Sequence, residues 1–475
     1  MVSTDRKTHY ASIFNDVLAP VTQGPSSSNT VGPFRIGTIA RSLLDGEPAE
    51  LEVRMSTGGG YFATFYNMES DKGLLSGILG RDLIEDDLGL VYGEAEKRGL
   101  KYEFIFSEDV PAFPTELALV KVSSEKETLT LRGISLGGGE ILIDEINGKP
   151  FEIKGICEEE IEIPGCEGAR TVPSVYPLHT DPDAVPVFTT SQGMLEYAEN
   201  NGKELWEAAV DYEMSLTGLS ADQVLKVAEK TLETAYRAIE RGLEPGVSFE
   251  GMTVAKAPEI KEKLGSVDLL PLGFGHLGGL QALAMVEYSN AHGIIVCMPT
   301  GGASGVIPAA ISSAARALGK SRENEVKALL TAGLIGVFYY PTHYHGALGC
   351  QAEVGIATSQ ASAALASFIT KDPRAVERAA VLGMQYLLGQ VCDPIEGYPQ
   401  VPCFIRNIAS VSVAGVCANY GVLGIDTAIT LDEMVGAVLR VGEALRERRI
   451  NDLGCCGCRY SANPLSTLGI KDKEK

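Results

Sequence analysis

Three cysteines in the second half of the chain are the residues whose type and spacing most directly suggest chemistry. Cys350 lies in "GALGCQAEVG", and Cys392 and Cys403 lie in "GQVCDPIEGYPQVPCFIRN". Forty-one residues separate the first two cysteines, and ten separate the second two. Neither the C-x2-C pattern of zinc sites nor the cysteine runs of ferredoxins has these spacings. The residues alone therefore leave both metal ligation and ordinary packing open.

The C-terminal "NDLGCCGCRYSANP" contains Cys455, Cys456 and Cys458, three thiols within four residues. Such a group fits an additional metal ligand, redox or zinc chemistry, or inert packing. The N-terminal "MVSTDRKTHYASIF" lacks the apolar stretch of a signal peptide. We therefore expect a cytoplasmic protein without structural disulfides. Cys297 and Cys417 lie in apolar surroundings and are expected in the core.

Two further segments place hydrogen-bond donors at the entrance of a helix. "GPSSSNTVGP" (24–33) precedes the helical pattern "FRIGTIARSLL", and "PTGGASG" (299–305) precedes another helix. The unpaired N–H groups and positive dipole end of a helix entrance suit a carboxylate, but Ser, Thr and Asn there are also good helix caps. The candidate substrate-binding residues in these segments are Ser26, Ser28, Asn29, Thr30, Thr300, Gly301 and Gly302.

The composition of the chain restricts the class of partner. The chain has 475 residues, of which 45% are hydrophobic, and a formal net charge of -22. Such an acidic chain argues against nucleic acid or an anionic membrane as the main partner, and an anionic substrate must be held by local donors. Pro341 and two histidines interrupt the apolar run 328–349. This run predicts a buried helix rather than a membrane span.

Up to about residue 155 the sequence alternates between strand and helix patterns. Period-two alternation of β-branched and aromatic residues predicts strands in "LEVRMS", "KYEFIFS" and "ELALVKVS", and on both sides of Gly137–Gly139. Helices are predicted in "GLLSGILG" and "LGLVYGEAEKRG". We therefore predict an α/β domain over residues 1–155.

Residues 156–187 are irregular and rich in proline, which predicts a linker. The pattern then becomes helical, and we predict a mostly α-helical domain over 188–475. Capping signals mark three of its helix starts, namely Ser220-x-x-Gln223, Asp372-Pro373 and Thr430-x-x-Glu433. The predicted fold class is a multidomain α+β protein.

These segments together resemble the iron–sulfur-dependent L-serine dehydratases (L-serine ammonia-lyases), over nearly the whole chain. The β-type domain of that family carries "GPSSSHTVGP", and its α-type domain carries "PTNGAxGxIP", "GCQxExG" and "GLVCDPVxGxxxVPCxxRN". The corresponding segments here are "GPSSSNTVGP", "PTGGASGVIP", "GCQAEVG" and "GQVCDPIEGYPQVPCFIRN". The order resembles the single-chain members, in which the β-type domain comes first.

The resemblance implies a lyase with a [4Fe–4S] cluster on Cys350, Cys392 and Cys403, one iron having no cysteine ligand. A base would take the α-proton of L-serine, the hydroxyl would leave on the open iron, and hydrolysis would give pyruvate and ammonia. In some members a C-terminal cysteine caps the open iron, which is a role for one of the C-terminal thiols here. The expected context is amino-acid metabolism and gluconeogenesis in a cytoplasmic homodimer whose partner is a small amino acid.

Two positions depart from the family pattern. Asn29 replaces a histidine of the serine-rich segment. "FATFYNMESDKG" (62–73) replaces a "GHGTD"-like segment, so that Asp71, a further candidate for substrate binding, remains but a second histidine is absent. Asparagine donates and accepts hydrogen bonds but does not carry protons near neutral pH.

The other histidines leave the general base unidentified. His343 and His345, which precede Cys350, are catalytic candidates that could supply an imidazole, or ordinary turn residues. His276 and His292 are expected to be structural. The alternative substrates are L-threonine, L-cysteine with loss of sulfide, or a β-hydroxy acid. A non-catalytic iron–sulfur or redox sensor is a further alternative, whereas pyridoxal phosphate is not expected because no lysine lies in a recognisable Schiff-base context.

Overall fold

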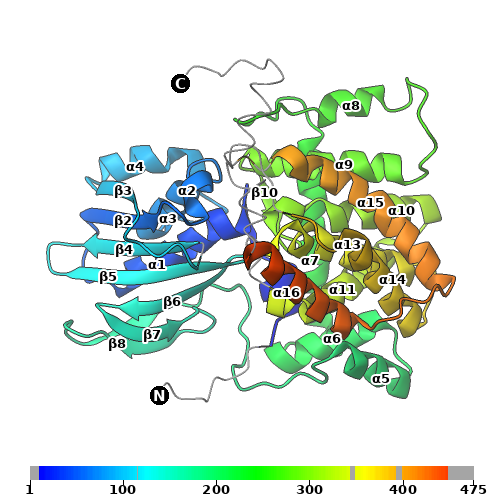
Figure 1. Ribbon diagram of the computed structural model, residues 1–475, viewed down its shortest axis with the longest axis horizontal. Coiled ribbons are helices and arrows are strands. Elements are labelled where there is room, and N and C mark those ends of the chain that lie inside the picture. Colours follow the sequence, from blue (N-terminus) through cyan, green and yellow to red (C-terminus); the bar gives the residue numbers. More distant parts are fainter. Residues whose placement is uncertain (1–9, 115, 343–347, 392–397, 399, 448–475) are drawn as a thin grey trace.

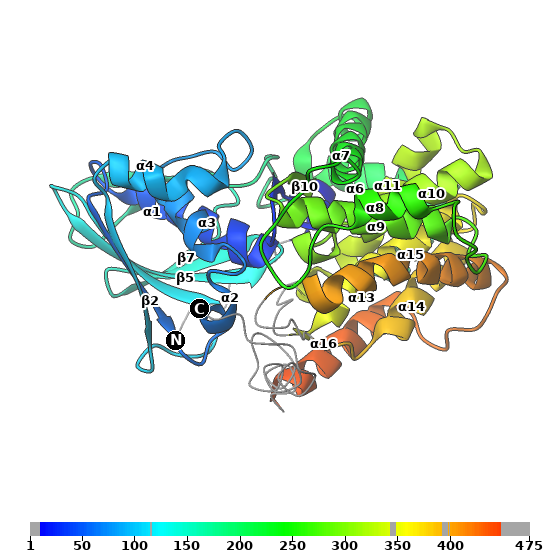
Figure 2. The ribbon, with the colours of Figure 1, turned by 90° about the horizontal axis from the view of Figure 1, so that it is seen from above.

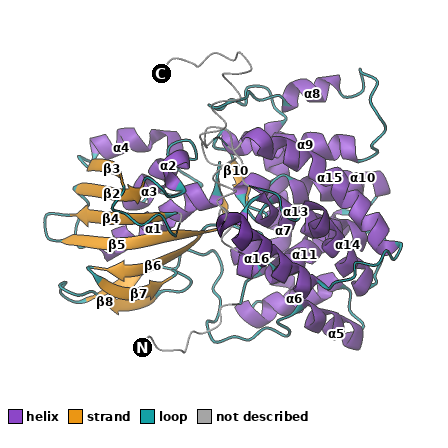
Figure 3. Ribbon diagram, viewed as in Figure 1, coloured by secondary structure: helices purple, strands orange, loops and turns teal. Residues whose placement is uncertain are grey.

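The computed structural model describes residues 10–114, 116–342, 348–391, 398 and 400–447. It has two lobes that lie side by side, one built on a β-sheet and the other built almost entirely of helices (Figure 1, Figure 2). Colouring by secondary structure separates the two lobes clearly (Figure 3). The predicted α+β arrangement is therefore confirmed.

The sheet lobe contains six strands in the order β3-β2-β4-β5-β6-β7, with β2 and β3 parallel and the other neighbours antiparallel. The strands are β2 (Glu50–Ser56), β3 (Lys101–Ser107), β4 (Leu117–Ser123), β5 (Thr128–Gly137), β6 (Glu140–Ile146) and β7 (Lys149–Ile153). Helices cover one face of this sheet (Figure 2), namely α1 (Gly32–Leu43), α2 (Tyr61–Thr64), α3 (Ser70–Ile78) and α4 (Val91–Lys97). Apolar side chains at alternate strand positions face these helices and form the core of the lobe.

The predicted strands and helices of this lobe are confirmed, including the hairpin through Gly137–Gly139, whose three residues all have positive φ. The segment 156–187 differs from an irregular linker. It contains a small antiparallel hairpin, β8 (Glu159–Glu162) with β9 (Ala169–Val172). Gly165 and Gly168 turn the chain between these strands with φ of 84° and 76°.

The helical lobe is built around helices that are buried on nearly all sides. Its helices are α5 (Ser191–Asn201), α6 (Leu205–Thr217), α7 (Ala221–Gly242), α8 (Ala257–Lys263), α9 (Gly275–Asn290), α10 (Val306–Leu318), α11 (Arg322–Phe338), α13 (Val354–Ser367), α14 (Pro373–Leu387), α15 (Gln400–Val422) and α16 (Leu431–Glu447). The predicted capping boxes at Ser220 and Thr430 and the cap at Asp372 are all present. The local sequence therefore determines where α7, α14 and α16 begin.

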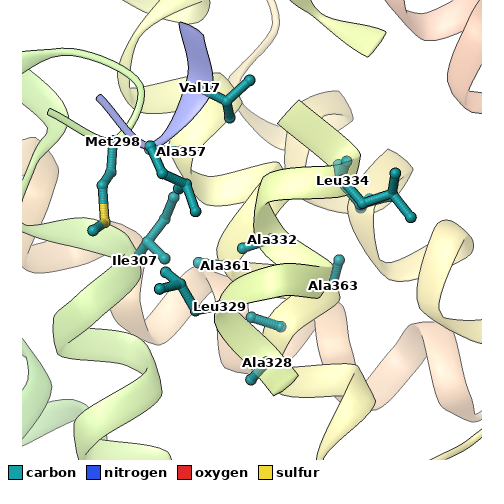
Figure 4. Close-up of a cluster of buried hydrophobic side chains, with 14 of the residues drawn as sticks. Val17, Met298, Ile307, Ala328, Leu329, Ala332, Leu334, Ala357, Ala361 and Ala363 are labelled. Carbon is teal, nitrogen blue, oxygen red and sulfur yellow. The ribbon is translucent and has the colours of Figure 1, made fainter. Parts of the chain in front are cut away.

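The first described residues pack into the helical lobe, although the sheet lobe follows them in the sequence. The π-helical turn η1 (Ile13–Val17) packs against α11. Val17 lies in the buried cluster of Figure 4, among residues of the helical lobe. The short strand β1 (Val21–Gln23) then pairs with β10 (Ile294–Val296) of that lobe. The chain thus crosses into the sheet lobe directly before the serine-rich segment, and the predicted domain limits stay a prediction.

Buried polar contacts hold the same crossing in place. Glu213 of α6 accepts hydrogen bonds from the Ser12 hydroxyl at 2.6 Å and the Ile13 N–H at 2.8 Å. Burial raises the pKa of Glu213 to about 7. The Tyr340 hydroxyl donates to Glu140 of the sheet lobe at 2.9 Å. The Glu213 hydrogen bonds therefore fasten the first described residues to the helical lobe, and the Tyr340–Glu140 hydrogen bond joins the two lobes.

Among the residues that the structure describes, one helix is long and apolar enough to cross a membrane. This helix is α15. It packs against α9, α13 and α14 of the helical lobe. A core helix of a globular protein has the same length and composition, and one side of α15 is buried, with Phe404 and Val411 among its buried residues, whereas Ile405 and Val416 are exposed.

Candidate active site

In the serine-rich segment 24–33 the helical conformation begins at Ser27, before the expected helix that starts at the Gly-Pro pair 32–33. Ser27–Val31 forms a π-helical turn, η2, which runs directly into α1. The Ser26 hydroxyl oxygen accepts a hydrogen bond from the Asn29 N–H at 3.1 Å and is the N-cap of this turn. Ser26 therefore has the capping role that its residue type allows.

The other hydroxyl groups of this segment have different partners. The Thr30 hydroxyl donates to the Met68 carbonyl at 2.9 Å, which fastens the segment to the start of α3. The Asn29 Oδ1 accepts a hydrogen bond from Thr64 at 2.9 Å. Ser28 is half-buried, and its hydroxyl lies 3.3 Å from Asn29 Nδ2. Asn29 Nδ2 also lies 3.4 Å from the Ser26 hydroxyl, and Asn29 is buried, so the half-buried Ser28 hydroxyl is the better placed of these groups to reach a ligand.

The glycine loop of the helical lobe lies directly against the serine-rich segment. A Cβ on Gly301, in the 3-10 turn Gly301–Ala303, would lie 2.9 Å from the Pro25 carbonyl oxygen and 3.3 Å from the Ser27 nitrogen. The Ser27 hydroxyl also forms a hydrogen bond with Cys297, whose pKa is raised by burial to about 12. The predicted core position of Cys297 is thus confirmed, and the two predicted anion-binding segments meet at the lobe interface.

Gly301→Ala is expected to push these two segments apart, because its methyl group would meet backbone atoms that cannot swing away. We expect kcat/KM to fall about 10- to 100-fold, since misplacing a positioning group by about 1 Å costs roughly 10²-fold. Steady-state kinetics and thermal melting check this result. Gly93→Ala is the control, because a Cβ there has no neighbour within 4 Å. Unchanged kinetics for Gly301→Ala would contradict the close packing.

Cys350 and Cys403 lie side by side, although they come from different elements. Cys350 begins the 3-10 turn Cys350–Ala352 after Gly349, whose φ is 83°. Cys403 lies near the start of α15, just after a break at Val401. Both thiols are buried, and a hydrogen bond joins their side chains. This bond, together with burial, raises the pKa of Cys403, so a bound cation would have to release the thiol protons.

The two residues before the third predicted ligand, Cys392, are hydrogen-bonded to the segments that carry Cys350 and Cys403. The Gln390 carbonyl accepts a hydrogen bond from the Gln351 N–H at 3.1 Å. The Val391 carbonyl accepts one from Arg406 Nη1, also at 3.1 Å. Cys392 itself lies outside the described residues. Among the described residues, no group of three or more His, Cys, Asp or Glu side chains could hold a metal ion.

A half-buried carboxylate, Glu353, lies beside the thiol pair and was not singled out from the sequence. Burial raises the pKa of Glu353, while the hydrogen bond from Thr300 and the charge of Arg406 act against this. A Cβ on Gly302 would lie 3.6 Å from Glu353 Oε2, so the carboxylate faces the glycine loop. Its charge also contributes to the raised pKa of Cys403. The signal available in the sequence was the Glu in "GCQAEVG".

Asn407 is a second residue that the sequence reasoning missed, although it ends the quoted segment "VPCFIRN". Its Nδ2 donates to the Gly302 carbonyl at 2.7 Å and to the Cys403 carbonyl at 2.9 Å. Its Oδ1 is buried and has no hydrogen-bond partner among the described residues. A buried amide oxygen of this kind is an acceptor for a ligand N–H or O–H.

Asp71 lies in the first turn of α3, close to the serine-rich segment. A Cβ on Gly73 would lie 2.2 Å from the Thr30 carbonyl oxygen, so these two segments are in backbone contact. The Tyr92 hydroxyl donates a short hydrogen bond to Asp71 Oδ2. Burial raises the pKa of Asp71 from 3.8 to about 6, although the bond from Tyr92 acts against this.

Asp71→Asn is expected to raise stability above pH 6. The unfolded chain loses the Asp71 proton near its usual pKa of 3.8, whereas the folded protein holds it to about pH 6. Stability therefore falls as pH rises through this window, by about 3 kcal/mol, since each pKa unit is about 1.4 kcal/mol. The variant lacks this penalty, so its thermal melting temperature should exceed that of the wild type at pH 8 and match it at pH 4. An equal difference at both pH values would contradict this account.

Several predicted site residues lie outside the described residues. They are Cys392, the histidines His343 and His345, and the C-terminal cysteines Cys455, Cys456 and Cys458. The roles predicted for them stay predictions. Cys417, by contrast, is buried in the helical lobe, as predicted.

Comparison with known proteins matches the chain to enzymes over both lobes. Residues 200–451 match the family model described as "Serine dehydratase alpha chain". The "L-serine dehydratase" of Mycobacterium bovis is 30% identical, over 88% of this chain and 92% of its own length. The "L-serine dehydratase 1" of Escherichia coli is 26% identical, over 90% and 94% respectively. The "Probable L-serine dehydratase, alpha chain" of Bacillus subtilis is 32% identical, over 52% of this chain and 88% of its own length.

The two-lobe fold, the site between the lobes and these similarities define a lyase. The chain belongs to the serine dehydratase family.

Proposed function

We propose that this enzyme eliminates water from L-serine, so that the resulting aminoacrylate hydrolyses to pyruvate and ammonia. One observation carries the proposal. The buried thiols of Cys350 and Cys403 lie together beside Glu353, near the place where the serine-rich segment meets the glycine loop. The names of the relatives support L-serine as the substrate.

The residues at this place fit the cofactor that the sequence predicts. Two buried thiols in contact suit a thiolate-liganded iron–sulfur cluster, and Asn407 Oδ1, which has no hydrogen-bond partner in the described part of the chain, is an acceptor for a polar ligand near them. Cys350, Cys403 and Cys392 would hold the cluster. When bound, a cluster with one iron free of cysteine supplies a Lewis acid that makes the serine hydroxyl a better leaving group.

The chain's own residues provide binding and proton transfer. The Ser28 hydroxyl, the Asn29 amide and the N–H groups at the start of η2 and of the glycine loop would bind the substrate carboxylate. Asn407 Oδ1 would accept a hydrogen bond from the substrate ammonium group. We assign removal of the α-proton to the Glu353 carboxylate, because burial raises its pKa and thereby strengthens it as a base.

The experiment that tests this function is keto-acid release by protein purified without oxygen. L-Serine is expected to give pyruvate faster than L-threonine, L-cysteine or a β-hydroxy acid. A preference for one of the other compounds would support the elimination reaction but show that L-serine is not the main substrate. A protein that retains its cluster but converts none of these compounds would contradict the proposal and favour the sensor function. Homodimer formation and a cytoplasmic location stay predictions.

A further inference from the structure

A hydrogen-bonded pair of side chains, His292 and Glu69, joins the two lobes beside the proposed site. His292 Nε2 lies 3.0 Å from Glu69 Oε1. His292 follows α9 in the helical lobe, and Glu69 immediately precedes α3 in the sheet lobe. Lys72 lies 2.8 Å from the other oxygen, Glu69 Oε2. Burial acts to raise the pKa of Glu69, but the hydrogen bonds from His292 and Lys72 outweigh it. The pKa of Glu69 is therefore lowered from its usual value, and the carboxylate is charged at neutral pH.

Both members of this pair have a left-handed backbone conformation. The φ angle is 62° at Glu69 and 58° at His292. Among the described non-glycine residues, only Asn147 and Ala428 share this feature. The left-handed region costs about 1–2 kcal/mol for such residues, and strain of this kind persists where surrounding contacts enforce it, often at functional sites. Here two strained residues from different lobes contact each other.

The serine-rich segment forms hydrogen bonds with the chain neighbours of both His292 and Glu69. The Gly24 N–H donates to the carbonyl of Gly293, the residue after His292, at 3.2 Å. The Met68 carbonyl, next to Glu69, accepts the Thr30 hydroxyl. The serine-rich segment is therefore hydrogen-bonded near its start to the residue after His292, and near its end to the residue before Glu69. The side chains of Glu69 and His292 are only 14% and 29% exposed, so solvent screens their interaction less than on the surface.

We propose that Glu69 and His292 form a positioning pair at the lobe interface. The pair fixes the position of the segment that carries Asp71 relative to the serine-rich segment, and substrate affinity therefore depends on it. The inference rests on the proposed function for its substrate, and on geometry alone for the positioning. Breaking the pair frees residues 67–72 and the start of η2 together. The effect falls on KM rather than on kcat, because neither side chain has a role in proton transfer.

The test compares His292→Asn with His179→Asn. Asparagine tolerates the left-handed conformation but has a shorter side chain and no imidazole, so His292→Asn removes the contact with Glu69 and spares the backbone. His179 is an exposed histidine elsewhere in the chain and makes a matched control. Hydrogen exchange of peptides covering residues 66–78, thermal melting and L-serine kinetics are measured on each variant. Glu69→Gln and the double variant complete a double-mutant cycle.

His292→Asn is expected to raise KM about tenfold with less than threefold change in kcat, and to speed exchange in residues 67–72. The double variant should be no worse than either single variant, and His179→Asn should match the wild type. Wild-type KM and exchange in His292→Asn would overturn the inference, as would additive effects in the double variant. If the wild type does not convert L-serine, the exchange result still decides the positioning, whereas the proposed function fails separately.

Discussion

Cys403→Ala is expected to abolish turnover and to remove most of the bound iron. The thiol is buried in contact with Cys350, and its loss leaves the proposed cofactor without one of three ligands. Lewis-acid assistance is worth several kcal/mol, so activity should fall by about 10³-fold or more. Iron analysis and pyruvate release from L-serine, both without oxygen, measure the two effects.

The matched control for this variant is Cys417→Ala. Cys417 lies in the same helix, α15, and is also buried, but its thiol forms a hydrogen bond with Ser362 of α13, and burial raises its pKa to about 11. We expect this variant to keep its iron and its activity while losing about 1 kcal/mol of stability. If Cys403→Ala behaved like Cys417→Ala, the thiol pair would have no part in the reaction.

Glu353→Gln is expected to lower kcat about 10²- to 10³-fold and to leave the iron content unchanged. The change removes the proposed proton acceptor but keeps the shape of the side chain, and general base catalysis typically contributes 10²- to 10⁴-fold. Single-turnover measurements with L-serine would separate this loss from a loss of binding.

Glu377→Gln is the control for Glu353→Gln. Glu377 is a buried carboxylate whose pKa is also raised by burial, and it accepts a hydrogen bond from the Leu431 N–H at 2.8 Å within the helical lobe. This variant should affect stability without changing kcat. A Glu353→Gln enzyme with wild-type kcat would show that another group takes the α-proton.

Local sequence signals predicted most of the fold. The capping boxes at Ser220 and Thr430 and the glycine hairpin at Gly137–Gly139 act over a few residues, so their structure follows from the residues themselves. The hairpin of β8 and β9 was missed, because its strands are short and mostly exposed and lack a clear alternation.

The site was harder to predict because it depends on contacts between distant segments. The motifs brought attention to Cys350 and Cys403, but only the fold shows their side chains in contact. The return of η1 to the helical lobe and the Glu69–His292 pair have no local signal at all. His292 was expected to be merely structural, since an isolated histidine in a sequence does not indicate its partner.

The proposed elimination depends on widely separated thiols converging on one iron–sulfur cofactor. Iron and acid-labile sulfide measured in protein purified without oxygen, with pyruvate release from L-serine assayed on the same sample, test this dependence. We expect about four irons and four sulfides per chain together with turnover. An iron-free protein that still converts L-serine at full rate would contradict it.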